Sequence, residues 1–356
     1  MMKHPILDRA ARILLMTGLL LAACTNPVPE KEADPLLIRS SQLEFSASGG
    51  SGHVTLETDE ALAAESDREW CKTRVSGSTI QLEVAPCGDL ESRNANLRIS
   101  TDKQTLRVTV RQAGAFIHMP DCDTTFLIGD ESVTLSLPGT SDIGMSVSGN
   151  VDWISGTFDG ELLSFSASEN TSGHIREGYA IFQAGKTRDS VRIIQGGIRD
   201  VCKRYILSGQ DNSGKATQAQ VVLSEASDRD LLLTFPDQGW TFTATFDPAD
   251  LSIHIPNMQY GGTTPVGAGR YHVFLHQYLS EQQLFNSSAG GSISAKFSYD
   301  AARDRTIAAF YDDGSWPGSV PDGIIVVAYS RRDASGAPAG LKRYPLILGK
   351  LRAETE

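Results

Sequence analysis

Apolar and polar residues alternate along much of this chain. In the segment 80–84, for example, Ile80, Leu82 and Val84 are separated by the polar residues Gln81 and Glu83, and the segments 105–111, 240–246 and 293–299 follow the same pattern. Alternation with a period of two places successive side chains on opposite faces of a β-strand, so that one face is apolar and the other is solvated. Antiparallel sheets have this character. The pattern therefore predicts an all-β protein.

The alternating segments repeat between residues 37 and 198. Three pairs of identical residues recur there at a common spacing of 83 positions, and the apolar positions of the strands between them match as well: Trp70 and Trp153, Arg93 and Arg176, Gln112 and Gln195. A repeat of this length, made of several short strands separated by turns, predicts two tandem immunoglobulin-like β-sandwiches. We place them at residues 37–115 and 116–198.

The repeat stops near residue 199, but the alternation continues to the end of the chain. About ten strand candidates follow, joined by turn-forming segments such as 211–214 and 247–250. No stretch with helical periodicity is long enough to connect parallel strands, so the sheet should be largely antiparallel. We predict an antiparallel β-barrel or a further sandwich over residues 199–356. This segment resembles the lipocalin-like β-domains attached to other exported lipoproteins.

The N-terminus has the pattern of an export signal. Lys3, Arg9 and Arg12 precede an apolar run at 13–23, which is shorter than the ~20 residues that a membrane-spanning helix needs. The run ends in Leu-Ala-Ala before Cys24, which resembles a bacterial lipobox, the site of signal cleavage and cysteine acylation by fatty acids such as palmitate. We therefore predict a signal peptide at residues 1–23 and lipidation of Cys24. The alternative is an ordinary signal with Cys24 as an unrelated thiol.

Lipidation would fix the location of the mature protein. Two or more acyl chains anchor a protein stably to a membrane. Thr25 follows the cysteine where an Asp would favour retention on the inner membrane. The segment that follows is rich in proline and charged residues, which predicts an extended tether over residues 24–36. The prediction is an outer-membrane, lipid-anchored protein on either the periplasmic or the exposed side.

The net charge of the chain is −11. An acidic surface repels phosphate backbones, so nucleic acid is not expected as a partner.

Export also changes the expectation for the cysteines, because thiols can pair outside the cytoplasm. Besides Cys24 the chain has Cys71, Cys87, Cys122 and Cys202, which allow three pairings. Cys71 and Cys87 flank one predicted hairpin and are the favoured disulfide. The alternative is four free thiols. No Cys-x-x-Cys or Cys/His cluster suggests a zinc site.

The residues that mark the repeat also suggest a family. In each copy a Trp follows an acidic residue, an Arg precedes a strand, and the last strand ends in Gln-Ala-Gly or Gln-Gly-Gly. This order resembles the BACON domain, a Bacteroidetes-associated, carbohydrate-binding, often N-terminal module, over residues 37–198. The resemblance implies association with carbohydrate. Many members have Asn at the position of Asn170, where the first copy has Cys87; this departure favours a local disulfide in the first copy.

Trp70 and Trp153 could cover the apolar faces of sugar rings. Each, however, lies at a fixed place among alternating core residues, which favours a packing role. Arg93 and Arg176 are expected to contact the backbone or acidic side chains at the start of a strand.

Two further motifs resemble functional sites, one for nucleotide binding and one for metal binding, but neither has the full pattern. The segment 209–215 fits the first seven positions of a P-loop, but Ala216 follows where a Ser or Thr would bind magnesium, and a strand, not a helix, comes next. His272 and His276 share the face of a strand about 13 Å apart, too far for one metal ion. We expect no cofactor, no metal site and no catalytic residues.

The loop 312–323 is the best candidate for ligand binding, because it places Trp316 among Gly, Pro and Asp residues. Tyr260, in the glycine-rich segment 259–269, is a second candidate. The alternative is that Trp316 folds back and caps the end of the barrel.

These observations support the hypothesis of a non-catalytic, glycan-associated envelope lipoprotein whose sandwiches form a stalk or contact glycans. The main alternative is a structural spacer or assembly subunit that binds another envelope protein. A hydrolase would need carboxylates or a Ser/His cluster converging in one cleft.

Overall fold

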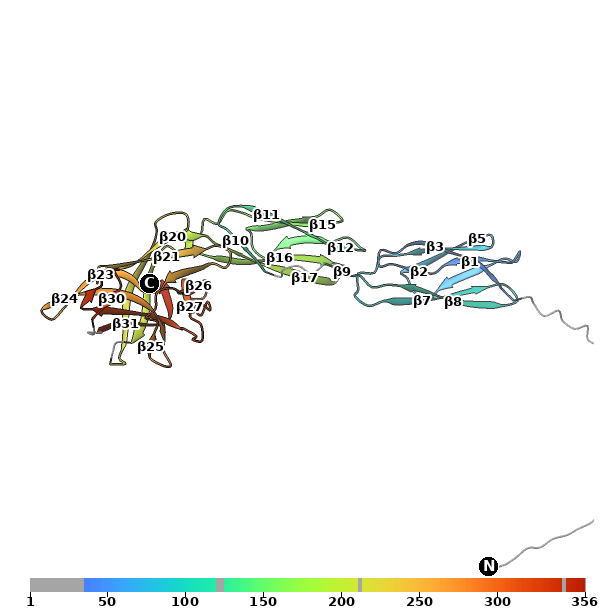
Figure 1. The fold of residues 1–356 in the computed structure, drawn as a ribbon. Helices are drawn as coiled ribbons and strands as arrows, with labels where there is room; N and C mark the ends of the chain where they lie inside the picture. The colour runs from blue at the N-terminus through green and yellow to red at the C-terminus, as the bar shows by residue number, and fades with distance from the viewer. Residues whose placement is uncertain (1–34, 120–124, 211–212, 341–343, 356) are drawn as a thin grey trace, which may run out of the picture.

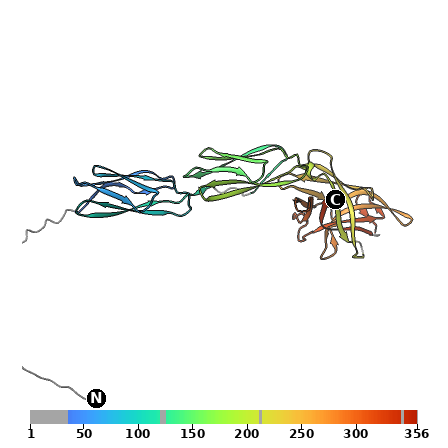
Figure 2. The same ribbon diagram turned by 180° about the vertical axis from the view of Figure 1, so that it is seen from behind.

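The computed structural model describes residues 35–119, 125–210, 213–340 and 344–355, with side chains up to residue 340. The described chain is built from strands, with one four-residue helix, α1 (Ile198–Val201). The predicted all-β fold class is confirmed. Figure 1 shows three units in a row, two sandwiches followed by a barrel, and Figure 2 shows the same elongated arrangement from behind.

No helix in the described ranges has both the length and the apolar character needed to cross a membrane.

The first sandwich consists of two four-stranded sheets packed face to face. One has the strand order β1-β3-β6-β5 and the other β2-β8-β7-β4. The alternation in the sequence explains the packing, because Ile80, Leu82 and Val84 all point into the core between the sheets. The strands are β1 (Ile38–Gln42), β2 (Glu44–Phe45), β3 (Gly50–Leu56), β4 (Ala63–Ser66), β5 (Cys71–Ser76), β6 (Thr79–Val84), β7 (Arg93–Ser100) and β8 (Thr105–Gln112).

The second sandwich repeats this arrangement at the 83-residue offset. In both copies a short strand near the start pairs in parallel with the last one, as β2 does with β8 and β10 with β17. Here β13 pairs with both β14 and β16, so the two halves join into one sheet with the order β10-β17-β16-β13-β14-β15-β11. The strands are β9 (Ile117–His118), β10 (Thr125–Ile128), β11 (Val133–Pro138), β12 (Thr140–Ser141), β13 (Ser146–Gly149), β14 (Ile154–Phe158), β15 (Leu162–Ala167), β16 (Arg176–Ala184) and β17 (Thr187–Gln195).

The third unit is a barrel. Eight strands pair antiparallel in a closed ring, β18-β19-β20-β21-β22-β26-β27-β31, and β31 returns to β18. This decides between the two predicted architectures. The ring strands are β18 (Arg204–Gln210), β19 (Ala216–Glu225), β20 (Asp230–Phe235), β21 (Trp240–Asp247), β22 (Ser252–Pro256), β26 (Ser292–Asp300), β27 (Arg305–Tyr311) and β31 (Tyr344–Thr355).

Large apolar side chains fill the inside of the barrel. They include Tyr205, Phe235 and Phe242, which are almost completely buried. Among the described side chains they leave a cavity with a volume of about 20 Å³ and an apolar lining. A space of this size, which holds about one water molecule, cannot take a ligand of lipocalin type.

Two insertions extend the barrel on one side. The first lies between β22 and β26 and the second between β27 and β31, and they join where β24 pairs with β28. From Val273 on, β24 is buried on both faces, as is β28, because their outward side chains, among them Phe274 and Tyr278, form a second apolar cluster with Met258 and Phe285. The inserted strands are β23 (Gln259–Val266), β24 (Gly269–Leu279), β25 (Leu284–Phe285), β28 (Gly323–Tyr329), β29 (Arg331–Arg332) and β30 (Pro338–Ala339).

Specific contacts join the two sandwiches. The Asp142 carboxylate accepts hydrogen bonds from the backbone N–H of Ala47 (3.0 Å) and of Phe116 (3.4 Å). The Lys186 N–H donates to the Gly88 carbonyl at 2.7 Å, and the Lys186 side chain pairs with Asp89. These contacts come from both units, so they restrict rotation about the connection.

The second sandwich and the barrel are joined through α1. Asp200 is buried and accepts hydrogen bonds from the Gly197 N–H and from the Asn170 amide, both at 3.0 Å. The His174 ring stacks on Tyr299 of the barrel with 3.9 Å between ring centroids. Ile175 belongs to the barrel core cluster. The end of the second sandwich therefore packs directly on the barrel.

Candidate functional site

The residues that mark the repeat form one contact set in each sandwich. The Arg93 guanidinium lies over the Trp70 ring, 4.3 Å from its centroid, and its Nε donates to the Gln112 side-chain oxygen at 2.9 Å. The second copy has the same contacts at the same two distances, between Arg176, Trp153 and Gln195.

This set ties the end of each sandwich together. Gln112 is buried, and its amide donates to the backbone carbonyls of Ser46, Ala47 and Ala85. Arg93 donates to the carbonyl oxygens of Ala85 and Pro86. The predicted packing role of the two Trp residues and the predicted backbone contacts of the two Arg residues are confirmed.

The favoured disulfide between Cys71 and Cys87 is not formed in the structure, where both are free, buried thiols. Cys71 belongs to the core between the sheets of the first sandwich. Cys87 packs instead with Ala47 and Ala115 in a small cluster against the second sandwich. The two side chains serve different packing clusters, which is why flanking one hairpin did not bring them together. Cys24 and Cys122 lie outside the described residues.

The two chemical near-matches have structural explanations. The P-loop-like segment joins β18 to β19, which pair antiparallel as far as Gln210 and Ala216, so no helix follows it. His272 and His276 both lie on β24, and His276 is completely buried and hydrogen-bonded to the Asn286 carbonyl. Within the part of the chain that the structure describes, no group of three or more His, Cys, Asp or Glu side chains could hold a metal ion.

The predicted ligand loop, which connects β27 to β28, is fixed at both ends. At its start Ser315 accepts a hydrogen bond from the Ser292 N–H and donates to the Ser292 carbonyl, both at 2.7 Å. At its end the Asp322 carboxylate accepts from the N–H of Ser280 at 2.8 Å and from its hydroxyl. Trp316 lies between these anchors and is half-buried.

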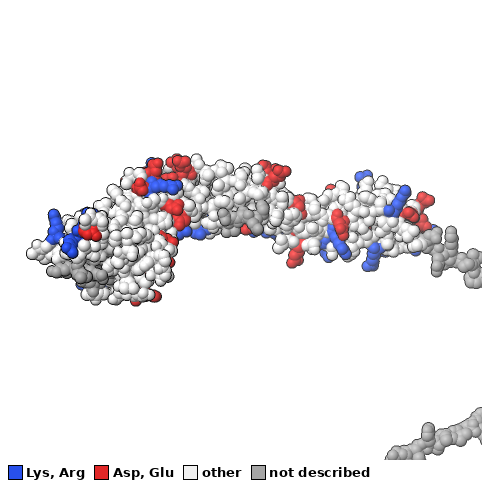
Figure 3. Space-filling model, viewed as in Figure 1, with Lys and Arg blue, Asp and Glu red and all other residues white. Residues whose placement is uncertain are grey.

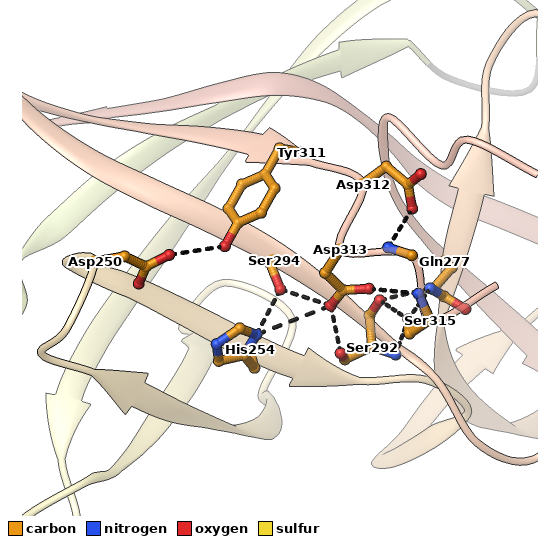
Figure 4. Close-up of polar contacts among 10 residues, drawn as sticks. Asp250, His254, Gln277, Ser292, Ser294, Tyr311, Asp312, Asp313 and Ser315 are labelled. Atoms are coloured by element: carbon orange, nitrogen blue, oxygen red, sulfur yellow. Dashed lines mark hydrogen bonds and ion pairs between the residues drawn. The ribbon is translucent and has the colours of Figure 1, made fainter.

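A polar cluster on the outer face of β22 and β26 supplies the first anchor, as Figure 4 shows. One oxygen of Asp313 accepts hydrogen bonds from the hydroxyls of Ser292 (2.6 Å) and Ser294 (2.7 Å). The other oxygen accepts from the Ser315 N–H at 3.0 Å. His254 Nδ1 lies 2.6 Å from Ser294 Oγ.

The hydrogen bonds keep Asp313 ionised. Burial alone would raise the pKa of this carboxyl group, but donation from Ser292, Ser315 and Ser294 outweighs it and lowers the pKa below 3.8. Nearby, burial raises the pKa of the Tyr311 phenol above 10.0, and Asp250, which accepts from its hydroxyl, acts in the same direction.

This Ser, His and Asp set does not have the geometry of a nucleophilic triad. Ser294 must donate its only proton to Asp313, because a carboxylate can only accept. His254 Nδ1 therefore carries the proton that it shares with Ser294, and cannot act there as a base. Ser294 is also completely buried. The cluster fixes the loop, and we find no reacting group in it.

Tyr260 and the Trp316 loop do not form one site. The Tyr260 ring contacts Phe274, at 5.5 Å between centroids, and the Arg332 guanidinium lies 4.1 Å from its centroid. Loop residue Ser315 instead contacts Gln277, at 3.1 Å. Phe274 and Gln277 are three positions apart on β24 and point to opposite faces. The guanidinium also covers part of the Tyr260 ring that a ligand would need.

Sequence reasoning found the loop but missed its support. In the alternating segment 293–299 Ser294 falls on the polar side of the strand, where exposure to solvent was expected, and the structure buries it. The alternation carried no signal that a loop from another part of the chain would cover this side of the strand.

A comparison with protein families matches residues 60–113 to the model described as "BACON: Putative binding domain, N-terminal". The matched segment lies in the first sandwich and includes Trp70, Arg93 and Gln112. No curated protein matches the sequence.

Three solved structures illustrate the structural comparison. A protein from Bacteroides thetaiotaomicron, determined by NMR, is 14% identical, with coverage of 24% of this chain and 92% of its own and a TM-score of 0.22. The titin I9-I11 tandem is 7% identical, with 87% and 97% covered and a TM-score of 0.32. The endo-fucoidan hydrolase MfFcnA4_H294Q is 12% identical, with 45% and 28% covered and a TM-score of 0.23. Scores this low carry no argument about function.

Proposed function

From the premise that the chain carries a BACON domain in its first sandwich, we propose that it is a non-catalytic, glycan-binding lipoprotein of the outer membrane, anchored through Cys24. The two sandwiches act as a stalk, and the barrel presents the loop with Trp316 to a glycan.

The rigid loop carries this proposal. A ligand loop that is already ordered loses little conformational entropy on binding, and hydrogen bonds at Ser315 and Asp322 order this one. A Trp ring can cover the C–H face of a sugar, while polar groups beside it bind hydroxyls. Asp312, at the start of the same loop and partly exposed, is such a group.

The stalk role is supported by the arginine contacts. In both sandwiches the guanidinium covers the Trp ring, which is therefore engaged in packing. The ordered connections at Asp142 and Asp200 would hold the barrel away from the membrane.

A glycan array of the mature protein tests the proposal. Wild type should bind one class of glycan, and Trp316→Ala should reduce its affinity at least tenfold, since base- or sugar-stacking rings contribute on the order of 1–3 kcal/mol. Trp70→Phe serves as the control, because this ring packs against the core of the first sandwich under Arg93 and belongs to neither proposed binding surface, so array binding should stay intact. Absence of binding by wild type to every glycan would remove the sugar part of the proposal.

The alternative, a spacer that binds another envelope protein, rests on the same ordered connections. It would then be favoured if wild type captured one envelope protein from detergent-solubilised membranes and bound no glycan.

A further inference from the structure

The outer face of β14, β15 and β11 in the second sandwich carries only hydroxyl side chains at its central positions. On the opposite side of the same strands, Ile154, Leu163 and Phe165 are buried in the core. The outward residues form two rows across the three strands, which we call the hydroxyl face: Ser155, Ser166 and Thr134 in one row, Thr157, Ser164 and Ser136 in the other.

The same positions in the first sandwich are different. Counting back 83 residues along the repeat gives a face on β5, β6 and β3 that holds three charged residues, two larger polar ones and one serine: Lys72, Glu83 and Ser51 in one row, Arg74, Gln81 and His53 in the other. Both copies have the same backbone registers, so the fold does not require hydroxyls there. The first copy carries charges at these positions and the second carries none.

The hydroxyl face is regular. The three strands lie about 4.8 Å from one another, and the two rows are about 6.8 Å apart along the strands. Thr134 and Ser166 hydroxyls hydrogen-bond at 2.7 Å, and Ser136 and Ser164 at 3.0 Å. Each hydroxyl can donate one hydrogen bond and accept two, so these pairs keep capacity for further partners.

A groove continues the face at one end. It has a volume of about 330 Å³, and the Trp153 side chain and the Asp152 side chain line it beside Ser155, Ser166 and Ser168. The Arg176 guanidinium covers one face of the Trp153 ring, so the ring contributes only the surface that remains, beside several neutral hydrogen-bonding groups and the Asp152 carboxylate. In Figure 3 the upper surface of the second sandwich, where Figure 1 places β11 and β15, is white between two groups of acidic side chains.

We infer that the hydroxyl face and this groove bind an uncharged glycan chain. The inference rests on the proposed function and adds to it a second contact surface, with the class of glycan. A neutral array offers no charge-assisted hydrogen bonds to an anionic polymer, and the acidic groups at its ends repel one. Protein interfaces are depleted in Ser, which argues against a protein occupant. A neutral polyol matches both the charge and the hydrogen-bonding capacity of the face.

The test exchanges residues between the two copies. Ser155 and Ser166 lie opposite each other in the second sandwich, as Lys72 and Glu83 do in the first. The double substitution Ser155→Lys with Ser166→Glu therefore introduces a charged pair that this fold already holds in its first copy. The control is the reverse exchange, Lys72→Ser with Glu83→Ser. Circular dichroism and thermal unfolding check that both variants fold.

Binding is measured with the full mature chain by affinity electrophoresis in gels that contain dextran, mannan or hydroxyethylcellulose, with polygalacturonate as the anionic probe. Wild type should be retarded by at least one neutral polymer and not by polygalacturonate. The Ser155→Lys/Ser166→Glu variant should bind at least tenfold more weakly, and the control variant like wild type. If the first variant fails to fold, Thr157→Arg with Ser164→Gln, again taken from the first copy, replaces it.

The outcomes separate this inference from the proposed function. If wild type and the folded face variant are retarded equally while Trp316→Ala loses binding, glycan binding by the hydroxyl face is overturned. The proposal that the Trp316 loop binds glycan then still stands. Retardation by polygalacturonate alone overturns the neutral ligand class. A wild-type chain that no polymer retards, and that binds nothing on the array, overturns both.

Discussion

At the scale of single residues, the three types that mark the repeat act together. Arg93 connects the Trp70 ring, the buried Gln112 side chain and two backbone carbonyls. Because a buried amide or carbonyl without a partner is costly, each member depends on the others. This explains why Trp, Arg and Gln persist together in both copies, while most outward-facing residues differ between them.

Removing the arginine tests this dependence. Arg93→Ala should lower the stability of the first sandwich by about 2 to 3 kcal/mol, since it deletes a cation–π contact and leaves the Gln112 oxygen with one donor fewer. We follow denaturant unfolding by the tryptophan fluorescence of the chain. The transition of the first sandwich should move to a lower denaturant concentration than in wild type. Arg111→Ala, at an exposed position on β8, is the control and should change stability little. Equal midpoints for Arg93→Ala and wild type would contradict the account.

At the scale of elements, the loop between β27 and β28 depends on one carboxylate. The pKa of Asp313 lies below 3.8 in the folded state because three serine donors bind its ionised form. A depressed folded-state pKa contributes stability that is complete above the unfolded pKa and is lost as pH falls through the folded value. The loop should therefore be ordered above about pH 5 and loosen below about pH 4.

The environment of the Trp316 ring reports this change. The emission of Trp316 is obtained by subtracting the spectrum of a Trp316→Phe chain from that of the parent chain. This difference spectrum should be constant from pH 7 to pH 5 and should shift to the red as the pH falls below about 4. Asp313→Asn should show the red-shifted emission already at pH 7, because its amide keeps one acceptor oxygen for three donors. Asp312→Asn, whose carboxylate accepts from the Gly314 N–H within its own turn, is the matched control. Identical emission of Asp313→Asn and wild type at pH 7 would refute the role of this anchor.

The sequence predicted the elements well because alternation and the 83-residue offset are local or directly repeated signals. It gave the strands, both sandwiches and the barrel as one of two architectures. It did not give the second core over β24 and β28, whose residues are buried on both faces and therefore do not alternate. The Cys71 and Cys87 pairing failed for a related reason, since Cys87 packs against a different unit of the chain.

At the scale of the whole molecule, the account describes a stalk of two sandwiches that carries a ligand-binding barrel. Its stiffness depends on close contacts between units. At the first connection Gly185 has φ +58°, and a Cβ atom there would lie 2.5 Å from the Gly88 carbonyl oxygen. That distance is too short for any side chain, so only glycine permits the observed packing.

Small-angle X-ray scattering of the mature chain without its acyl groups, compared with Gly185→Val, tests the stalk most directly. The control is Gly77→Val, at φ +60° but with no neighbour within 4 Å of an added Cβ, so it carries the same backbone strain away from the connection. The account predicts the scattering of an extended rod for wild type and for Gly77→Val, and a broader, more flexible distribution of distances for Gly185→Val. A wild-type profile of a compact or freely jointed particle, unchanged by the substitution at Gly185, would contradict it.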